Sequence, residues 1–190
     1  MRRTSAGGLD AADLLRIAGW VGVNGLAAWL VGSVICRDSP QIAVGLFGLV
    51  LGMLQSTAIS RTWREALAWT ALTAMALPLA GLLAIVPVFL VVYGFLHEVW
   101  IAGALMGLIV GAAVGLAQGA VFQWRDPVAR VTGIWTLGNS IAGAVVGAGS
   151  FAVSASACGP LDLAGAAFGV SFGVLTALPL AAVLRRSAVR

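Results

Sequence analysis

The sequence contains no lysine and few charged residues of any kind. Among its 190 residues are 11 arginines and 7 acidic residues, so that 9% of the chain is charged. A soluble globular chain carries about 25% charged residues, and these side chains are therefore too few to coat a soluble surface. His97 is the only histidine and there are two cysteines. With so few ligand side chains the sequence predicts no metal site and no cofactor.

Apolar residues and glycine take the place of charge. Hydrophobic residues make up 61% of the chain, the mean hydropathy is +1.03, and 25 residues are glycine. This composition is typical of helices packed within lipid. It predicts an integral membrane protein whose first partner is the lipid bilayer. Despite a pI near 10.5, it excludes a nucleic-acid-binding protein, because the arginines of such a chain serve mainly to orient it in the membrane.

The spacing of the charged and polar residues predicts six transmembrane helices. Since a bilayer core of about 30 Å needs roughly 20 apolar residues, one all-α transmembrane domain is expected over residues 17–184, between a cytoplasmic segment 1–16 and a tail 185–190. From Pro87 to Val99 we expect an interfacial or re-entrant stretch. The expected spans are Ile17 to Cys36, Gln41 to Ser60, Ala66 to Val88, Trp100 to Phe122, Val131 to Ser154, and Leu161 to Leu184.

The arginines predict the orientation of these spans. With six crossings, Arg37 alone falls on one side and the other arginines fall on the opposite side. Cytoplasmic loops retain arginine, so both termini are expected in the cytoplasm of a bacterial cell, with the protein in the cytoplasmic membrane. The first span is expected to be an uncleaved signal anchor. Five tryptophans near the inner face are expected to form an aromatic belt: Trp20, Trp63, Trp69, Trp124 and Trp135.

Cys36 and Cys158 both fall on the expected outer side. An oxidising exterior would allow a disulfide between them. Two unpaired thiols that act as small hydrophobic side chains are the alternative.

Two short patterns recur three times along the chain. The even-numbered spans contain G-x-x-x-G-x-x-[QT], ending at Gln55, Gln118 and Thr176, and the odd-numbered spans contain W-x-x-x-[NT], ending at Asn24, Thr73 and Asn139. Such self-similarity indicates a repeat architecture. We expect three parallel two-helix hairpins, over about 17–60, 66–122 and 131–184, related by a pseudo-threefold axis along the membrane normal.

Glycines spaced four residues apart mark the even-numbered spans. Small residues at this spacing let helix backbones approach closely in lipid. We expect the even spans to form a tight inner cluster with the odd spans outside; a homodimer interface through the same stripes is the alternative. The packing glycines are Gly48 and Gly52 in the second span, Gly103, Gly107, Gly111, Gly115 and Gly119 in the fourth, and Gly165, Gly169 and Gly173 in the sixth.

Six uncharged polar side chains fall at one depth, about 8 to 13 Å from the inner ends of their spans at 1.5 Å rise per residue. Polar groups in hydrocarbon need partners. They are expected either to bond to one another between helices or to line a binding site or narrow pore. The six are Asn24, Gln55, Thr73, Gln118, Asn139 and Thr176. No titratable residue lies deep in any expected span, so no enzyme is expected.

The repeated motifs resemble those of a group of uncharacterised bacterial multi-pass membrane proteins. In that group G-x-x-Q-W-x-x-L-R is followed by W-x-x-x-[AS]; here Gln55 precedes Arg61 and Trp69, and Gln118 precedes Arg125 and Trp135. The resemblance covers about Gly45 to Leu137. Ser56 and Gly119 stand where the pattern has Trp, and Thr176 stands where it has Gln. It implies a membrane location and no particular activity.

Three function classes fit this sequence. The first is a small-solute binding or transport component, similar in size and number of spans to the substrate-binding subunits of bacterial vitamin uptake systems, with the glycine stripe of span four open to dock a membrane partner protein. The second is a non-catalytic assembly or scaffold protein, alone or as a homo-oligomer. The third is a channel for small neutral solutes. A pocket of at least about 300 Å³ would favour the first.

Overall fold

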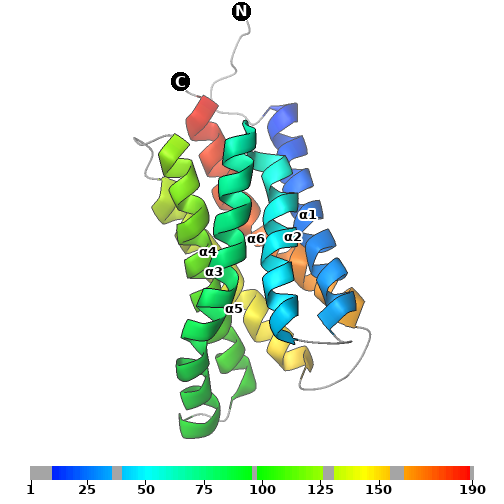
Figure 1. Ribbon diagram of the computed structural model, residues 1–190, viewed down its shortest axis with the longest axis vertical. Helices are drawn as coiled ribbons and strands as arrows, with labels where there is room; N and C mark the ends of the chain where they lie inside the picture. Colours follow the sequence, from blue (N-terminus) through cyan, green and yellow to red (C-terminus); the bar gives the residue numbers. More distant parts are fainter. Residues whose placement is uncertain (1–9, 36–39, 96–97, 126–130, 155–160, 189–190) are drawn as a thin grey trace, which may run out of the picture.

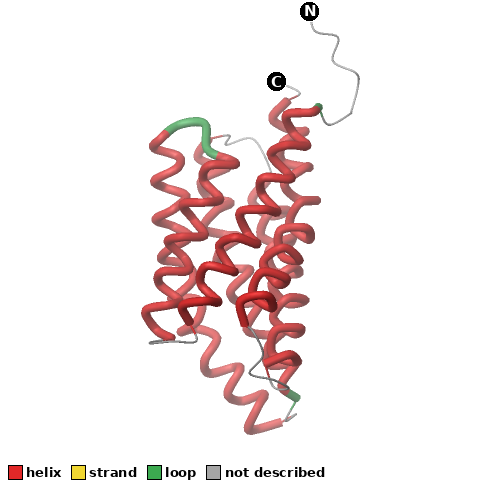
Figure 2. Tube along the Cα trace, turned by 90° about the vertical axis from the view of Figure 1, so that its right-hand side faces the viewer, coloured by secondary structure: helices red, strands yellow, loops and turns green. Residues whose placement is uncertain are grey.

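The computed structural model describes residues 10–35, 40–95, 98–125, 131–154 and 161–188. Over these ranges the chain forms six α-helices and no strand (Figure 2). A π-helical turn, η1, covers Val91–Phe95. The helices are α1 (Ala11–Ile35), α2 (Pro40–Ile59), α3 (Trp63–Leu90), α4 (Val99–Arg125), α5 (Val131–Ser154) and α6 (Leu161–Ala188).

Within these ranges four helices are long and apolar enough to cross a membrane, namely α3 with η1, α4, α5 and α6. In α2 a shorter apolar stretch covers Leu46–Ile59. The outer faces of the helices carry large hydrophobic side chains, including Leu82, Leu83 and Leu178, which are 65%, 70% and 79% exposed. Several amides and hydroxyls, by contrast, are buried, among them Asn24, Gln55 and Gln118. This distribution fits a protein surrounded by lipid.

The helix ends differ from the expected spans mainly by extension. α5 has the expected bounds, whereas α1 begins at Ala11 rather than Ile17, and α6 continues to Ala188. At the start of α1, the Asp10 carboxylate accepts a hydrogen bond from the backbone N–H of Asp13 at 2.8 Å. An acidic side chain at this position satisfies one of the free donors of a first helical turn. Part of the polar N-terminal segment is therefore helical.

The stretch from Pro87 to Val99, expected to be interfacial or re-entrant, is helical over its described part up to Phe95, which contradicts a re-entrant turn there. α3 continues through Pro78 and Pro87 to Leu90, and η1 follows without a break. The backbone N–H of Val91 donates to the carbonyls of Pro87 and Val88. In apolar surroundings a backbone that leaves the helix loses its internal hydrogen bonds, which favours helix here although both prolines lack a donor.

The six helices form a closed ring in chain order. Each helix packs against its neighbours in the chain, and α6 packs against α1. In the described part of the chain, the backbones of α2, α4 and α6 do not pack against one another, and α2 and α4 meet only through side chains such as Gln55 and Gln118. The expected inner cluster of even-numbered helices is therefore wrong: the even helices lie in the ring itself, each beside two odd helices.

Both described ends of the chain, the start of α1 and the end of α6, lie at the same end of the ring (Figure 1). The turn from α2 to α3 lies there too. It brings Arg61 and Arg64 together with Arg16 in the first turns of α1 and Arg125 in the last turn of α4. We call this the arginine end of the ring.

Aromatic side chains fill the ring close to the arginine end. Trp20, Trp69 and Trp135, from the three odd helices, are at most 1% exposed, and Phe122 packs with them. The centroids of Trp20 and Trp135 lie 5.4 Å apart, and those of Trp69 and Phe122 lie 5.2 Å apart, in edge-on arrangements that are worth about 0.5–1.5 kcal/mol per pair. We call these four residues the aromatic cluster.

The expected aromatic belt is thus wrong for Trp20, Trp69 and Trp135, which face inward, while Trp63 and Trp124 are 68% and 66% exposed. An indole buried in a bundle needs an acceptor for its N–H. The three inward tryptophans each have one, in the polar layer described below.

Candidate functional site

Three pairs of helices meet at glycine with the same register. A Cβ atom added to Gly52 would lie 2.9 Å from the Cα of Thr70; at Gly115 it would lie 2.7 Å from the Cα of Thr136, and at Gly173 2.9 Å from the Cα of Val21. In each case the facing residue directly follows a tryptophan of the aromatic cluster. The close pairs are therefore α2 with α3, α4 with α5, and α6 with α1.

The glycine stripe of α4 is covered by α5. Gly107 lies against Gly143, Gly111 against Asn139 and Ser140, and Gly119 against Thr132. Gly103 lies against Gly147, and in the other two pairs Gly48 lies against Ala74 and Gly169 against Asn24. The stripe of span four was expected to be open for a partner, and this expectation is wrong because α5 occupies it. The side-chain surroundings of Gly165 lie outside the described residues.

The same indole hydrogen bond occurs in all three close pairs. The Nε1–H groups of Trp20, Trp69 and Trp135 donate to Thr176 Oγ1 at 2.8 Å, Gln55 Oε1 at 3.3 Å and Gln118 Oε1 at 3.2 Å. In each pair the donor opens the W-x-x-x-[NT] pattern and the acceptor ends the G-x-x-x-G-x-x-[QT] pattern. The two sequence patterns are thus joined in each pair by a hydrogen bond from an indole N–H to a side-chain oxygen.

The glutamine amides link two of the three pairs to the preceding odd helix. Gln55 Nε2 donates to Asn24 Oδ1 at 2.9 Å, and Gln118 Nε2 donates to Thr73 Oγ1 at 3.0 Å and to Gln55 Oε1 at 2.7 Å. Thr176 has no amide to donate. The equivalent acceptor, Asn139 Oδ1, is buried without a hydrogen-bond partner in the described part of the chain.

Side-chain hydrogen bonds thus join Asn24, Gln55, Thr73 and Gln118 directly, while Thr176 and Asn139 bond to Trp20 and Trp135. We call these six residues, which are the six expected from the sequence, the polar layer. None is more than 2% exposed. Their side chains bond mainly to one another and to the aromatic cluster, and beyond them Ala27, Leu51, Leu77 and Val114 form a second apolar cluster. Along the axis of the ring the polar layer is therefore closed on both sides by packed apolar side chains.

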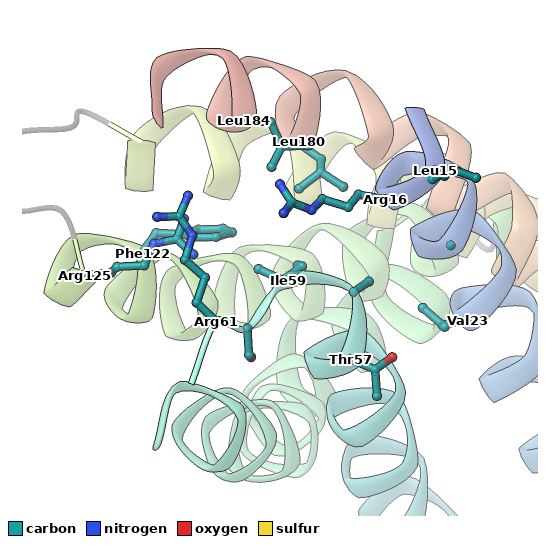
Figure 3. A pocket seen from close by; sticks show the side chains of 13 residues that line it. Leu15, Arg16, Val23, Thr57, Ile59, Arg61, Phe122, Arg125, Leu180 and Leu184 are labelled. Carbon is teal, nitrogen blue, oxygen red and sulfur yellow. The ribbon is translucent and has the colours of Figure 1, made fainter. Parts of the chain in front are cut away.

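A cavity of about 450 Å³ lies at the arginine end, above the aromatic cluster. Four helices contribute to it. Figure 3 shows Arg16 from α1 between Arg61 and Arg125 on one side and Val23 and Thr57 on the other. The lining consists of Leu15, Arg16, Gly19, Val23, Thr57, Ala58, Ile59, Ser60, Arg61, Phe122, Arg125, Leu180 and Leu184.

One carboxylate, Glu65, positions two of the cavity's arginines. Its Oε2 accepts from the backbone N–H of Arg61 at 2.8 Å and lies 3.9 Å from Nη1 of Arg125. The hydroxyl of Thr62, the N-cap of α3, accepts from the backbone N–H of Glu65 at 3.3 Å. This first turn of α3 therefore connects the α2–α3 turn to the end of α4.

The arginines of the cavity differ in their acidic partners. Arg16 pairs with Asp13 at 3.6 Å and Arg125 pairs with Glu65. For Arg61 the described residues provide no ion pair. Three guanidinium groups thus face two carboxylates, which leaves the cavity mouth positively charged.

None of the predicted site residues lines this cavity, and from the sequence its arginines were expected only to orient the chain in the membrane. One signal was available: Arg61 and Arg125 follow the glutamines of the polar layer at nearly equal spacing. Cys36, Cys158 and His97 lie outside the described residues.

Comparison of the chain with protein-family models, with curated proteins and with solved structures found no match.

Proposed function

We propose that this chain is a non-catalytic component of the cytoplasmic membrane that binds a small solute at its arginine end, as a binding or transport component. The observation that carries this proposal is the cavity of about 450 Å³. Ligand sites start at about 300 Å³ and combine apolar walls with a few polar groups. The cavity has both.

In this proposal all six helices cross the bilayer and the arginine end faces the cytoplasm. The described arginines support it, because Arg16, Arg61, Arg64 and Arg125 all lie at one end of the ring. Cytoplasmic loops retain arginine. Both chain termini would then be cytoplasmic.

We also propose that the ring consists of three equivalent units around a pseudo-threefold axis, with α2–α3, α4–α5 and α6–α1 as the units. The equal glycine registers and the three indole bonds support this arrangement. It differs from the hairpins expected from the sequence, which paired each odd helix with the even helix that follows it.

The closed axis favours a binding component over a channel. A solute that moved through the centre would have to displace the aromatic cluster and break the bonds of the polar layer. The stripe of α4 is covered by α5, so a partner protein of the transport component would have to dock elsewhere. Deep in the bundle the polar layer carries only amides and hydroxyls, and its neighbours in the aromatic cluster add only indole N–H groups, which supports a protein without catalytic chemistry.

The experiment that tests this proposal fills the cavity. Gly19 lines it and has no atom within 4 Å of an added Cβ, so Gly19→Leu places a side chain in the cavity without a clash. Gly22, on the same helix, has equal space but does not line the cavity, and Gly22→Leu is the matched control. Native mass spectrometry of protein extracted from host membranes would then read attached small molecules.

We expect a small mass that is attached to the wild type and to Gly22→Leu and is missing from Gly19→Leu. A wild type that carries no small molecule, or a mass that remains attached to Gly19→Leu, would contradict the proposal. The same spectra give the subunit count and any co-extracted partner protein.

A further inference from the structure

Charged and apolar side chains line the cavity at different depths. Arg61 lies in the turn two residues beyond Ile59, the last residue of α2, and Arg125 ends α4 three residues beyond Phe122, so both apolar side chains lie deeper than the arginines that follow them. On α1 the lining extends from Leu15 to Val23, which is about 12 Å along the helix at 1.5 Å rise per residue.

This length exceeds the polar part of a bilayer leaflet. The headgroup region occupies about 5–8 Å on each side of the hydrocarbon core, from a total thickness of about 40–45 Å and a core of about 30 Å. A cavity whose charged mouth lies at headgroup level therefore continues into the depth of the acyl chains.

The cavity also has an open side. Leu15 and Thr57 line it from the neighbouring helices α1 and α2, and both are exposed. The outside of the ring at this point faces the bilayer in the arrangement proposed above. A ligand with an apolar chain could therefore enter sideways from the leaflet without losing the lipid contacts of its chain.

From these features we infer that the cavity binds an anionic phospholipid, with its phosphate at Arg16, Arg61 and Arg125 and the start of an acyl chain against the apolar wall. The inference rests on the proposed function and names its ligand class. Guanidinium groups bind phosphate oxygens through paired hydrogen bonds, and basic pockets between transmembrane helices on the cytoplasmic side suit anionic headgroups. Arg61 is the arginine best placed to bind the phosphate, since no described carboxylate forms an ion pair with it.

The test uses delipidated full-length protein in mild detergent. It is titrated separately with dioleoylphosphatidylglycerol, dioleoylphosphatidylcholine and glycerol 3-phosphate, and native mass spectrometry measures the bound fraction. We expect one tightly bound phosphatidylglycerol, much weaker binding of phosphatidylcholine because it has no net charge, and no retained glycerol 3-phosphate because it has no chain.

Arginine variants identify the site. Arg16→Gln with Arg61→Gln should weaken phosphatidylglycerol binding about 30-fold, from about fivefold for each arginine near an anionic headgroup. Arg64→Gln is the matched control, since Arg64 lies at the same end but stacks on Trp63 at 5.5 Å outside the cavity, and it should bind as the wild type does. If the double variant does not fold, Arg61→Gln alone should bind about fivefold more weakly.

Three results would overturn the inference: equal binding of phosphatidylcholine, equal binding of glycerol 3-phosphate, or equal losses in Arg64→Gln and the double variant. Gly19→Leu separates this failure from failure of the proposed function. If Gly19→Leu releases a bound molecule that is neither anionic nor lipid, the proposed function stands and the inference fails. If no molecule of any kind depends on Gly19, both fail.

Discussion

Replacement of Thr176 by glutamine should stabilise the protein. In two of the three close pairs a glutamine at this register accepts from a tryptophan and donates its amide to the preceding odd helix. In the third pair, Thr176 accepts from Trp20, and Asn139 Oδ1 has no described donor. Thr176→Gln would keep the first bond through its carbonyl oxygen and supply the missing amide.

The expected gain follows from a count of bonds. The substitution adds one hydrogen bond to a buried acceptor and removes the intrahelical donation from Thr176 Oγ1, which is shared between the carbonyls of Phe172 at 2.8 Å and Gly173 at 3.3 Å; both oxygens can keep their helical partners. Side-chain hydrogen bonds within membranes average about 0.6 kcal/mol, and an unsatisfied buried acceptor costs about 1–3 kcal/mol. Ordering the longer side chain offsets part of this. We expect about 1 kcal/mol of net stabilisation, or about 2–4 °C in Tm for a chain of this size.

Thermal unfolding in detergent, followed by tryptophan fluorescence, measures this gain. A double-mutant cycle with Asn139→Ala assigns it: Thr176→Gln should stabilise the wild-type background and should lose that effect when Asn139 is absent. A lower Tm for Thr176→Gln, or an equal gain in both backgrounds, would show that the third pair is not built like the other two.

Two further substitutions, each with a control, test the glycine packing and the polar layer. Gly115→Ala should destabilise the protein by about 1–3 kcal/mol because its Cβ would press on the backbone of α5. The control is Gly133→Ala, which has nothing within 4 Å and should be neutral or stabilise the protein by up to about 1 kcal/mol through helix propensity. Chemical unfolding measures both free energies, and equal effects would contradict the close approach of α4 and α5. Gln118→Leu breaks three hydrogen bonds and should lower the free energy of unfolding by about 2 kcal/mol, at about 0.6 kcal/mol for each bond. The control Thr57→Val, on the exposed face, should change it very little. A Tm within 1 °C of wild type for Gln118→Leu, about a quarter of the expected fall, would contradict the polar layer as described.

Residue spacing alone was enough to predict the helices and the common depth of the polar residues. Every α-helical residue adds the same rise, so Asn24 and Gln55 could be placed at one level from their distances to the span ends. The same spacing predicts the common depth of the other four residues of the polar layer. The rotation of each helix about its axis, and so the neighbour that each face meets, cannot be predicted from spacing.

The glycine stripes illustrate what rotation decides. A stripe such as Gly107 to Gly119 shows that a backbone must approach, but it does not show which helix approaches. In the ring that helix is α5, whose own glycines Gly143 and Gly147 meet it. The tryptophans were misjudged for a related reason: at this depth an indole can face the headgroups or turn inward to an amide, and only the neighbouring helix settles the choice.

The cavity could not be predicted from the sequence because its lining comes from four helices. Arg16, Arg61 and Arg125 are far apart in the sequence, and each is explained sufficiently by orientation in the membrane. That they surround one space depends on how the ring closes.

The packing of α6 against α1 has a consequence for the biosynthesis of the protein. Of the six helices, α1 is synthesised before its close partner α6, so Asn24 and Trp20 are made long before Gly173 and Thr176. Until α6 is made, α1 has only its second neighbour in the ring, α2, to pack against. A nascent chain stalled between α5 and α6 should therefore hold α1 in an exchangeable position, and the ring closes only once α6 has been made.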